Sequence, residues 1–309
     1  MASWTTSAWS AAASVLLALL AATARADVLL TEGTNLNVDV SADGRVVTDL
    51  LGRLWVVPAA GGDAVALTEG LRAARRPQWS PAGDRIVYES SDAAGTTLWV
   101  YRMDVGDEVR LGDTRHSSHE PDWHPDGTRV VFSSARHDTG LDIWETDIPT
   151  GLSRRLTQTP GAESEPAWSA NGRDLVWIRR HEETWSLMLR RQGGADEVLA
   201  EYESPIAAPS WRPDGSLITY LLFDEDRWTA RMSILSEPRL DRPLLEEADL
   251  FLSPIAWRGR QQMIYAANGR IRTRGFDEWT PEVLRFTARV NEANGLSRTR
   301  AAQRPLPEI

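Results

Sequence analysis

Short runs of alternating apolar and polar residues recur along this chain at nearly constant spacing. The segment PQWSPAGDRIVY returns as PDWHPDGTRVVF, PAWSANGRDLVW and PSWRPDGSLITY, and in weaker form as VDVSADGRVVTD and PIAWRGRQQMIY. Each copy carries a turn glycine, and successive glycines are 39, 44, 45, 43 and 44 residues apart. These glycines are Gly44, Gly83, Gly127, Gly172, Gly215 and Gly259. A period of roughly 40–45 residues with strand-like alternation is typical of propeller blades.

Each repeat predicts four strands. The first begins at a proline, where a missing N–H costs no ladder bond, and ends at a Pro-Asp-Gly type of corner. An alternating apolar strand, a polar hairpin, a strand carrying a tryptophan and a strand often closing with Leu-Thr follow. Six copies of about 44 residues need roughly 264 residues. We therefore predict an all-β fold, a six-bladed β-propeller of four-stranded blades, over residues 27–290.

The two ends of the chain lie outside the repeats. Residues 11–22 form an apolar run too short to span a bilayer comfortably, and Ala24-Arg25-Ala26 matches a signal-peptidase site. Residues 1–26 are therefore predicted to be a signal peptide, which places the protein in the periplasm or outside the cell. Residues 291–309 form a polar tail. Two segments compete for the outer strand that closes the ring, Val28–Thr31 and residues 282–290, and the pattern leaves both open.

Tryptophan is frequent, with 14 in the chain. Ten of the twelve after residue 26 occupy two repeated positions, in the first and third strands of the repeats. Burial of one tryptophan removes roughly 150–250 Å² from water. Packing between blades is therefore favoured over a surface that stacks sugars or bases. Trp279 falls outside both positions and is expected to be exposed.

The charge and the reactive side chains narrow the function. The net charge is −10, which argues against nucleic-acid binding and against docking on anionic lipid. With no cysteine there is no thiol nucleophile, and no G-x-S-x-G or H-E-x-x-H motif occurs. The residues at His116, His119, Glu120, Asp122 and His124 have the types of a zinc site, but neighbouring strand residues point to opposite faces. We expect no enzymatic activity, no cofactor and no metal site.

The repeated P-x-W-S-P-D-G phrase, with its I/L-W strand and closing L-T, resembles the TolB-type propeller repeat over nearly all of residues 34–290. The resemblance implies an exported six-bladed propeller of the bacterial envelope. The opening TEGTNLNVDVSADGRVVTDLLGRLWVVPAAGG is also similar to the N-terminal propeller of secreted proteins that carry an amidohydrolase domain.

The mouth of the central channel is the candidate binding site. The residues that start the innermost strands ring one opening, and they differ from blade to blade while the frame repeats. In register these are Asn37, Arg76, Glu120, Glu165, Ala208 and Ser253, with Arg75 and His119 one step earlier. The resemblance implies that a partner segment is received there.

Three functional hypotheses remain. The leading one is a non-catalytic, exported scaffold that binds an envelope protein or peptide, without stable membrane insertion. The second is a detached accessory propeller that gates or docks a partner hydrolase of the amidohydrolase type. The third is a propeller that binds a glycan or another small ligand, which requires exposed tryptophans in the channel.

Overall fold

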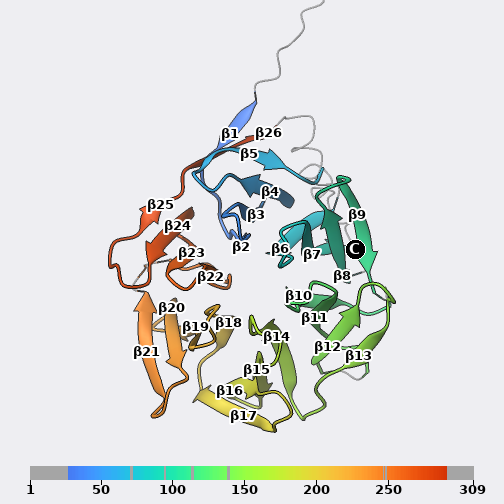
Figure 1. Ribbon diagram of the computed structural model, residues 1–309, viewed down its shortest axis with the longest axis vertical. Helices are drawn as coiled ribbons and strands as arrows, with labels where there is room; N and C mark the ends of the chain where they lie inside the picture. Colours follow the sequence, from blue (N-terminus) through green and yellow to red (C-terminus); the bar gives the residue numbers. More distant parts are fainter. Residues whose placement is uncertain are drawn as a thin grey trace, which may run out of the picture.

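The described residues form β-strands and turns around a common centre (Figure 1). The computed structural model describes residues 27–69, 72–93, 95–112, 115–137, 140–245, 247 and 249–290. Within these ranges there are 26 strands and no helix, and no segment could cross a membrane as a helix. The predicted signal peptide and the predicted tail lie outside the described residues. The strands confirm the six-bladed propeller of four-stranded blades.

The first three blades follow in chain order, each running outward from its inner strand. Blade 1 contains β2 (Val38–Val40), β3 (Val46–Leu50), β4 (Arg53–Val57) and β5 (Gly62–Ala66). Blade 2 contains β6 (Ala73–Trp79), β7 (Arg85–Asp92), β8 (Gly95–Arg102) and β9 (Asp107–Leu111). Blade 3 contains β10 (Ser118–Trp123), β11 (Arg129–Ser134), β12 (Asp142–Asp147) and β13 (Ser153–Arg155).

The last three blades repeat the same antiparallel order. Blade 4 contains β14 (Ala162–Trp168), β15 (Leu175–His181), β16 (Thr184–Arg190) and β17 (Asp196–Tyr202). Blade 5 contains β18 (Ile206–Trp211), β19 (Leu217–Asp224), β20 (Arg227–Ile234) and β21 (Leu240–Leu245). Blade 6 contains β22 (Ala256–Arg258), β23 (Gln262–Ala267), β24 (Arg270–Gly275) and β25 (Glu282–Val283).

Both segments that competed to close the ring take part in the closure. β26 (Phe286–Val290) pairs in parallel with β5, and β1 (Val28–Leu30) pairs antiparallel with β26. The two ends of the described chain therefore lie together on the outside of blade 1 (Figure 1). Because β25 is the outer strand of blade 6, the last residues are free to cross to blade 1 and tie the two blades together.

The hydrophobic core is a series of layers between blades. Val47 of blade 1 packs in one cluster with Trp79 of blade 2, and Val87 of blade 2 packs in the next with Trp123 of blade 3. The first-strand tryptophans of blades 2, 3, 5 and 6 are buried, as the packing interpretation predicted. Trp279 is 90% exposed, which confirms its expected position.

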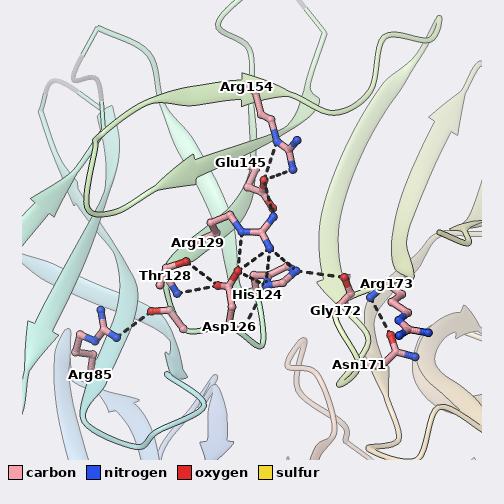
Figure 2. A network of polar contacts seen from close by, with 11 residues as sticks. Arg85, His124, Asp126, Thr128, Arg129, Glu145, Arg154, Asn171, Gly172 and Arg173 are labelled. Atoms are coloured by element: carbon pink, nitrogen blue, oxygen red, sulfur yellow. Dashed lines mark hydrogen bonds and ion pairs between the residues drawn. The ribbon is translucent and has the colours of Figure 1, made fainter. Parts of the chain in front are cut away.

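A polar contact reinforces several of these layers on the same side of the ring. A side chain of one blade reaches over the tryptophan of the next and donates to a carbonyl oxygen in its first turn. Arg85 donates to Gly127 over the ring of Trp123, and His124 bonds the Gly172 carbonyl beside Trp168 (Figure 2). In the same way Arg45 donates to the Gly83 carbonyl, and Arg212 donates to the Arg260 carbonyl.

The tryptophan layers generate a stability prediction. Trp123 is 4% exposed, and its Nε1 donates to the Gln78 carbonyl of blade 2. Trp123→Ala should lower the free energy of unfolding by about 3–5 kcal/mol, because it leaves a cavity and an unpaired carbonyl between two blades. The matched control is Trp279→Ala, which should be neutral. Urea denaturation checks both, and equal stability of the two variants would contradict the packing assignment.

Candidate binding channel

The inner strands enclose a central cavity of about 230 Å³. Of the described residues, four carboxylates and one arginine line it: Asp39, Glu120, Asp122, Glu165 and Arg76. These residues come from β2, β6, β10 and β14. A cavity of this size holds a side chain or a few atoms of a chain end and is too small for a folded element.

A β-bulge places the residues at the mouth. Arg76, Glu120, Glu165 and Ala208 each adopt a left-handed backbone with φ between 49° and 56°, and each precedes a proline. The strand register shifts at each of these positions. Non-glycine residues adopt this conformation at a cost of about 1–3 kcal/mol when the surroundings fix it. The bulge turns the backbone N–H of each residue toward the preceding blade.

Carboxylates of the preceding blade accept these N–H groups. Asp49 accepts from Arg76 at 3.1 Å and Glu89 accepts from Glu120 at 2.6 Å. Glu120 in turn accepts from Glu165 at 2.9 Å, and Glu165 accepts from Ala208 at 2.5 Å. A chain of hydrogen bonds from carboxylate to backbone thus links blades 1 to 5 around the mouth.

Arg76 is the cation of this chain. Its guanidinium lies 3.6 Å from a Glu120 carboxylate oxygen and 3.9 Å from one of Glu89. Burial and the neighbouring charges of Glu120 and Glu89 raise the pKa of Glu165 to about 7, although Arg76 opposes this. Burial likewise raises the pKa of Glu89 and raises that of Asp49 to about 6. One guanidinium is therefore shared by more carboxylates than it can neutralise.

A second tier of carboxylates stands two residues further along the inner strands. Asp39 accepts the backbone N–H of Trp79 at 2.6 Å, and Asp122 accepts that of Trp168 at 2.8 Å. Burial raises the pKa of Asp39 to about 6. Burial, with a contribution from the charge of Asp39, raises that of Asp122 to about 7.

Apart from Asn37, Gln78 and Ser210, the rest of the cavity wall is apolar. It comes from β14, from β18, from the turns after these two strands, and from β22 with the residues that lead into it, and proline and tryptophan are its large residues. They are Pro166, Trp168, Pro209, Trp211, Pro213, Pro254 and Trp257. Trp211 and Trp257 are buried, and Trp168 is half-buried. The cavity thus has one acidic side and one apolar side.

The structure brings most of the predicted mouth residues together. Asn37, Arg76, Glu120 and Glu165 line the cavity. Arg75 is exposed, His119 is half-buried, and neither is part of the lining. Ser253 is buried, and its Oγ accepts the N–H of Val38 in blade 1 at 3.1 Å. Pro254 lines the cavity in its place. In the other repeats the tryptophan is the second residue after the proline, whereas Trp257 is the third residue after Pro254, which shifts the register by one position.

Sequence reasoning missed Asp39, Asp49 and Glu89 as parts of the channel, and it considered Asp122 only as a metal ligand. Asp39 and Asp122 stand two residues after the mouth positions Asn37 and Glu120, so strand alternation was the available signal. For Asp49 and Glu89 the signal was an acidic residue within the second strand, after its alternating apolar positions. Within the described ranges, no three histidine, aspartate or glutamate side chains are grouped to hold a metal ion.

Part of the chain matches a known protein family. Residues 52–182 match the family model of the TolB β-propeller domain. No curated protein sequence matches the chain.

Solved structures share the fold at low sequence identity. A candidate TolB from Agrobacterium tumefaciens is 18% identical with a TM-score of 0.62, and the match covers 74% of this chain and 86% of that one. TolB from Acinetobacter baumannii is 17% identical with a TM-score of 0.57, covering 70% and 54%. The tricorn protease is 14% identical with a TM-score of 0.67, covering 82% and 26%. The chain thus spans about half of the second protein and a quarter of the third.

The channel carboxylates generate a pH prediction. The folded-state pKa values of five of them lie above the values near 4 of the unfolded chain, so between pH 4 and 7 the folded state binds more protons. They are Asp39, Asp49, Glu89, Asp122 and Glu165. The free energy of unfolding should therefore fall as the pH rises through this window. Carboxylates with lowered pKa values titrate below this window and do not affect the slope within it. Asp126, which accepts the Thr128 N–H and pairs with Arg129, is an example.

The channel aspartate provides the variant for this test. Asp122→Asn keeps an oxygen that can accept the Trp168 N–H but no longer titrates, so it should flatten the decline. One unit between the folded and unfolded pKa values corresponds to about 1.4 kcal/mol. Urea denaturation from pH 5 to pH 8 measures the slope, with Asp63→Asn on the exposed strand β5 as control. A slope that Asp122→Asn leaves unchanged would show that Asp122 titrates normally.

Proposed function

We propose that this six-bladed propeller, which matches the TolB β-propeller model over residues 52–182, is an exported, non-catalytic scaffold that binds a segment of an envelope protein or peptide at its central channel. The observation that carries the proposal is the two-sided cavity, in which carboxylates face a wall of proline and tryptophan. An extended chain segment supplies both complements, because it carries backbone and side-chain donors together with apolar groups.

The charge of the channel defines the partner segment more closely. Glu165 and Asp122 have pKa values raised to about 7 and share the cavity with one arginine among the described lining residues. An ammonium or guanidinium group that enters would favour their ionised forms and replace the solvation lost by burial. The segment is therefore expected to present a basic side chain or an amino terminus, with an apolar residue beside it.

The arrangement of the carboxylates supports a binding role over a catalytic one. Buried acids with raised pKa values also occur at catalytic sites. Here Asp39, Asp122 and Glu165 each accept a backbone N–H of the next blade, which commits one carboxylate oxygen to holding the ring. No serine or histidine stands among the described residues that line the cavity apart from Ser210, whose hydroxyl bonds Thr219 and the Ile255 carbonyl.

A second candidate is an accessory propeller that docks or gates a separate hydrolase. The fold similarity to a quarter of the tricorn protease favours this candidate, because a propeller of this shape forms one part of a larger enzyme there. Both candidates use the same channel, and they differ in the identity of the bound protein.

Affinity capture tests the channel assignment. Ala170 is an exposed lining residue in the turn between β14 and β15, so Ala170→Trp should narrow the opening without disturbing the core. The tagged chain is incubated with the envelope fraction of its own cells, and mass spectrometry identifies the proteins retained. Ala170→Trp should lose the retained partner, whereas Ala195→Trp, in an exposed turn outside the cavity, should keep it.

The outcomes separate the candidates. A lost partner that is an envelope protein supports the scaffold, and a lost partner that is a hydrolase supports the accessory propeller. A partner retained equally by both variants would move the binding site away from the channel. No partner above background with the unmodified chain would contradict both candidates.

A further inference from the structure

The seam between blades 3 and 4 holds a second cavity, of about 450 Å³, away from the acidic side of the channel. Among the described residues its lining contains five arginines and no carboxylate. They are Arg129, Arg154, Arg173, Arg190 and Arg191. In a chain with a net charge of −10, the lining thus gathers guanidinium groups, whereas the carboxylates that pair with some of them stand outside it.

A change in the repeat accounts for the cavity. At the preceding seam Arg85 spans to the next blade and donates to the Gly127 carbonyl. Arg129 occupies the equivalent position of blade 3, but here the shorter His124 bonds the Gly172 carbonyl at 3.2 Å. Arg129 instead turns to Asp126 and Glu145 (Figure 2). A Cβ on Gly172 would lie 2.8 Å from the His124 ring, so glycine keeps this approach possible.

Two of the five arginines are fully engaged within the protein. Arg129 donates its Nε and one terminal nitrogen to Asp126 and its other terminal nitrogen to Glu145, so all three of its nitrogen atoms are used. Arg190 forms a bidentate pair with Asp196 and donates its third nitrogen to the Leu156 carbonyl. These two arginines build the walls of the cavity and have little left to offer a ligand.

The other three arginines keep donors available. Arg173 lies in the exposed turn between β14 and β15, and its backbone N–H donates to Asn171 (Figure 2). Within the described part of the chain its guanidinium forms no hydrogen bond or ion pair. Arg191 uses only its Nε, on Glu197 at 3.3 Å, and its side chain is 49% exposed. Arg154 uses Nε and one terminal nitrogen on Glu145, and its side chain is 64% exposed.

We propose that this seam pocket binds a small ligand with at least two oxyanion groups, held between Arg154 of blade 3 and Arg173 and Arg191 of blade 4. A guanidinium fork matches the paired oxygens of a carboxylate, phosphate or sulfate, and such charge-assisted bonds are about twice as strong as neutral ones. Leu156, Leu175 and Trp168 complete the lining and provide an apolar surface for the body of the ligand. This site is independent of the partner in the channel.

Titration with two kinds of anion tests the site. Pyrophosphate probes the phosphate source and trigalacturonate probes the carboxylate source, each at constant ionic strength because salt screens exposed charges. Isothermal titration calorimetry on the whole chain should show saturable binding of at least one probe. The probe that binds identifies the source of the oxyanion.

Arginine variants locate the binding. Arg173→Gln combined with Arg191→Gln should weaken binding by at least about tenfold, since the double variant removes two charge-assisted hydrogen-bond donors. Arg110→Gln, on the exposed strand β9 outside the pocket, should leave the affinity unchanged. Thermal unfolding without ligand verifies that each variant is folded. The proposal would be overturned if neither probe bound saturably, or if Arg110→Gln weakened the binding as much as the double variant does.

Discussion

The structure depends on how the inner strand of one blade is fixed to the next. At the mouth of the channel, a bulge in the inner strand presents a backbone N–H to a carboxylate of the preceding blade, as between Glu120 and Glu165. Behind it a tryptophan such as Trp123 packs into the layer between the two blades. The tryptophan supplies the apolar burial, and the hydrogen bond sets the orientation of the strand around the ring. Both the channel and the seam pocket exist because these contacts hold adjacent blades at a fixed angle.

The same contacts explain why acidic groups remain buried in the channel. A buried carboxylate loses its hydration, and the raised pKa values of Asp49 and Asp122 record that loss. Hydrogen bonds from Arg76 and Trp168 backbone N–H groups recover part of it. Asp122 also lines the cavity, together with Asp39, Glu120 and Glu165. The carboxylates that fix one blade to the next are therefore also the acidic groups of the cavity wall.

The sequence predicted the blades of this protein better than the contacts between them. The spacing of Gly83 and Gly127 and the repeated tryptophans were sufficient for the blades, because alternation and turn chemistry are local properties of the chain. Asp49 and Glu89 were not recognised as channel residues, because their role arises only when the next blade is placed beside them. Closure by both β1 and β26 likewise depends on pairing between distant ends, which no local pattern encodes.

Departures from the repeat carry more functional information than the repeat itself. The bulge position holds Arg76 in blade 2, glutamate in blades 3 and 4, and Ala208 in blade 5, although the backbone there has the same left-handed conformation. The bulge therefore forms with four different neighbours and three different side chains, so its backbone conformation does not require one residue type. His124 is a second departure, because it takes over a contact that Arg85 makes one blade earlier. Trp168 lines both cavities, so the first-strand tryptophan of blade 4 belongs to the wall of both candidate sites.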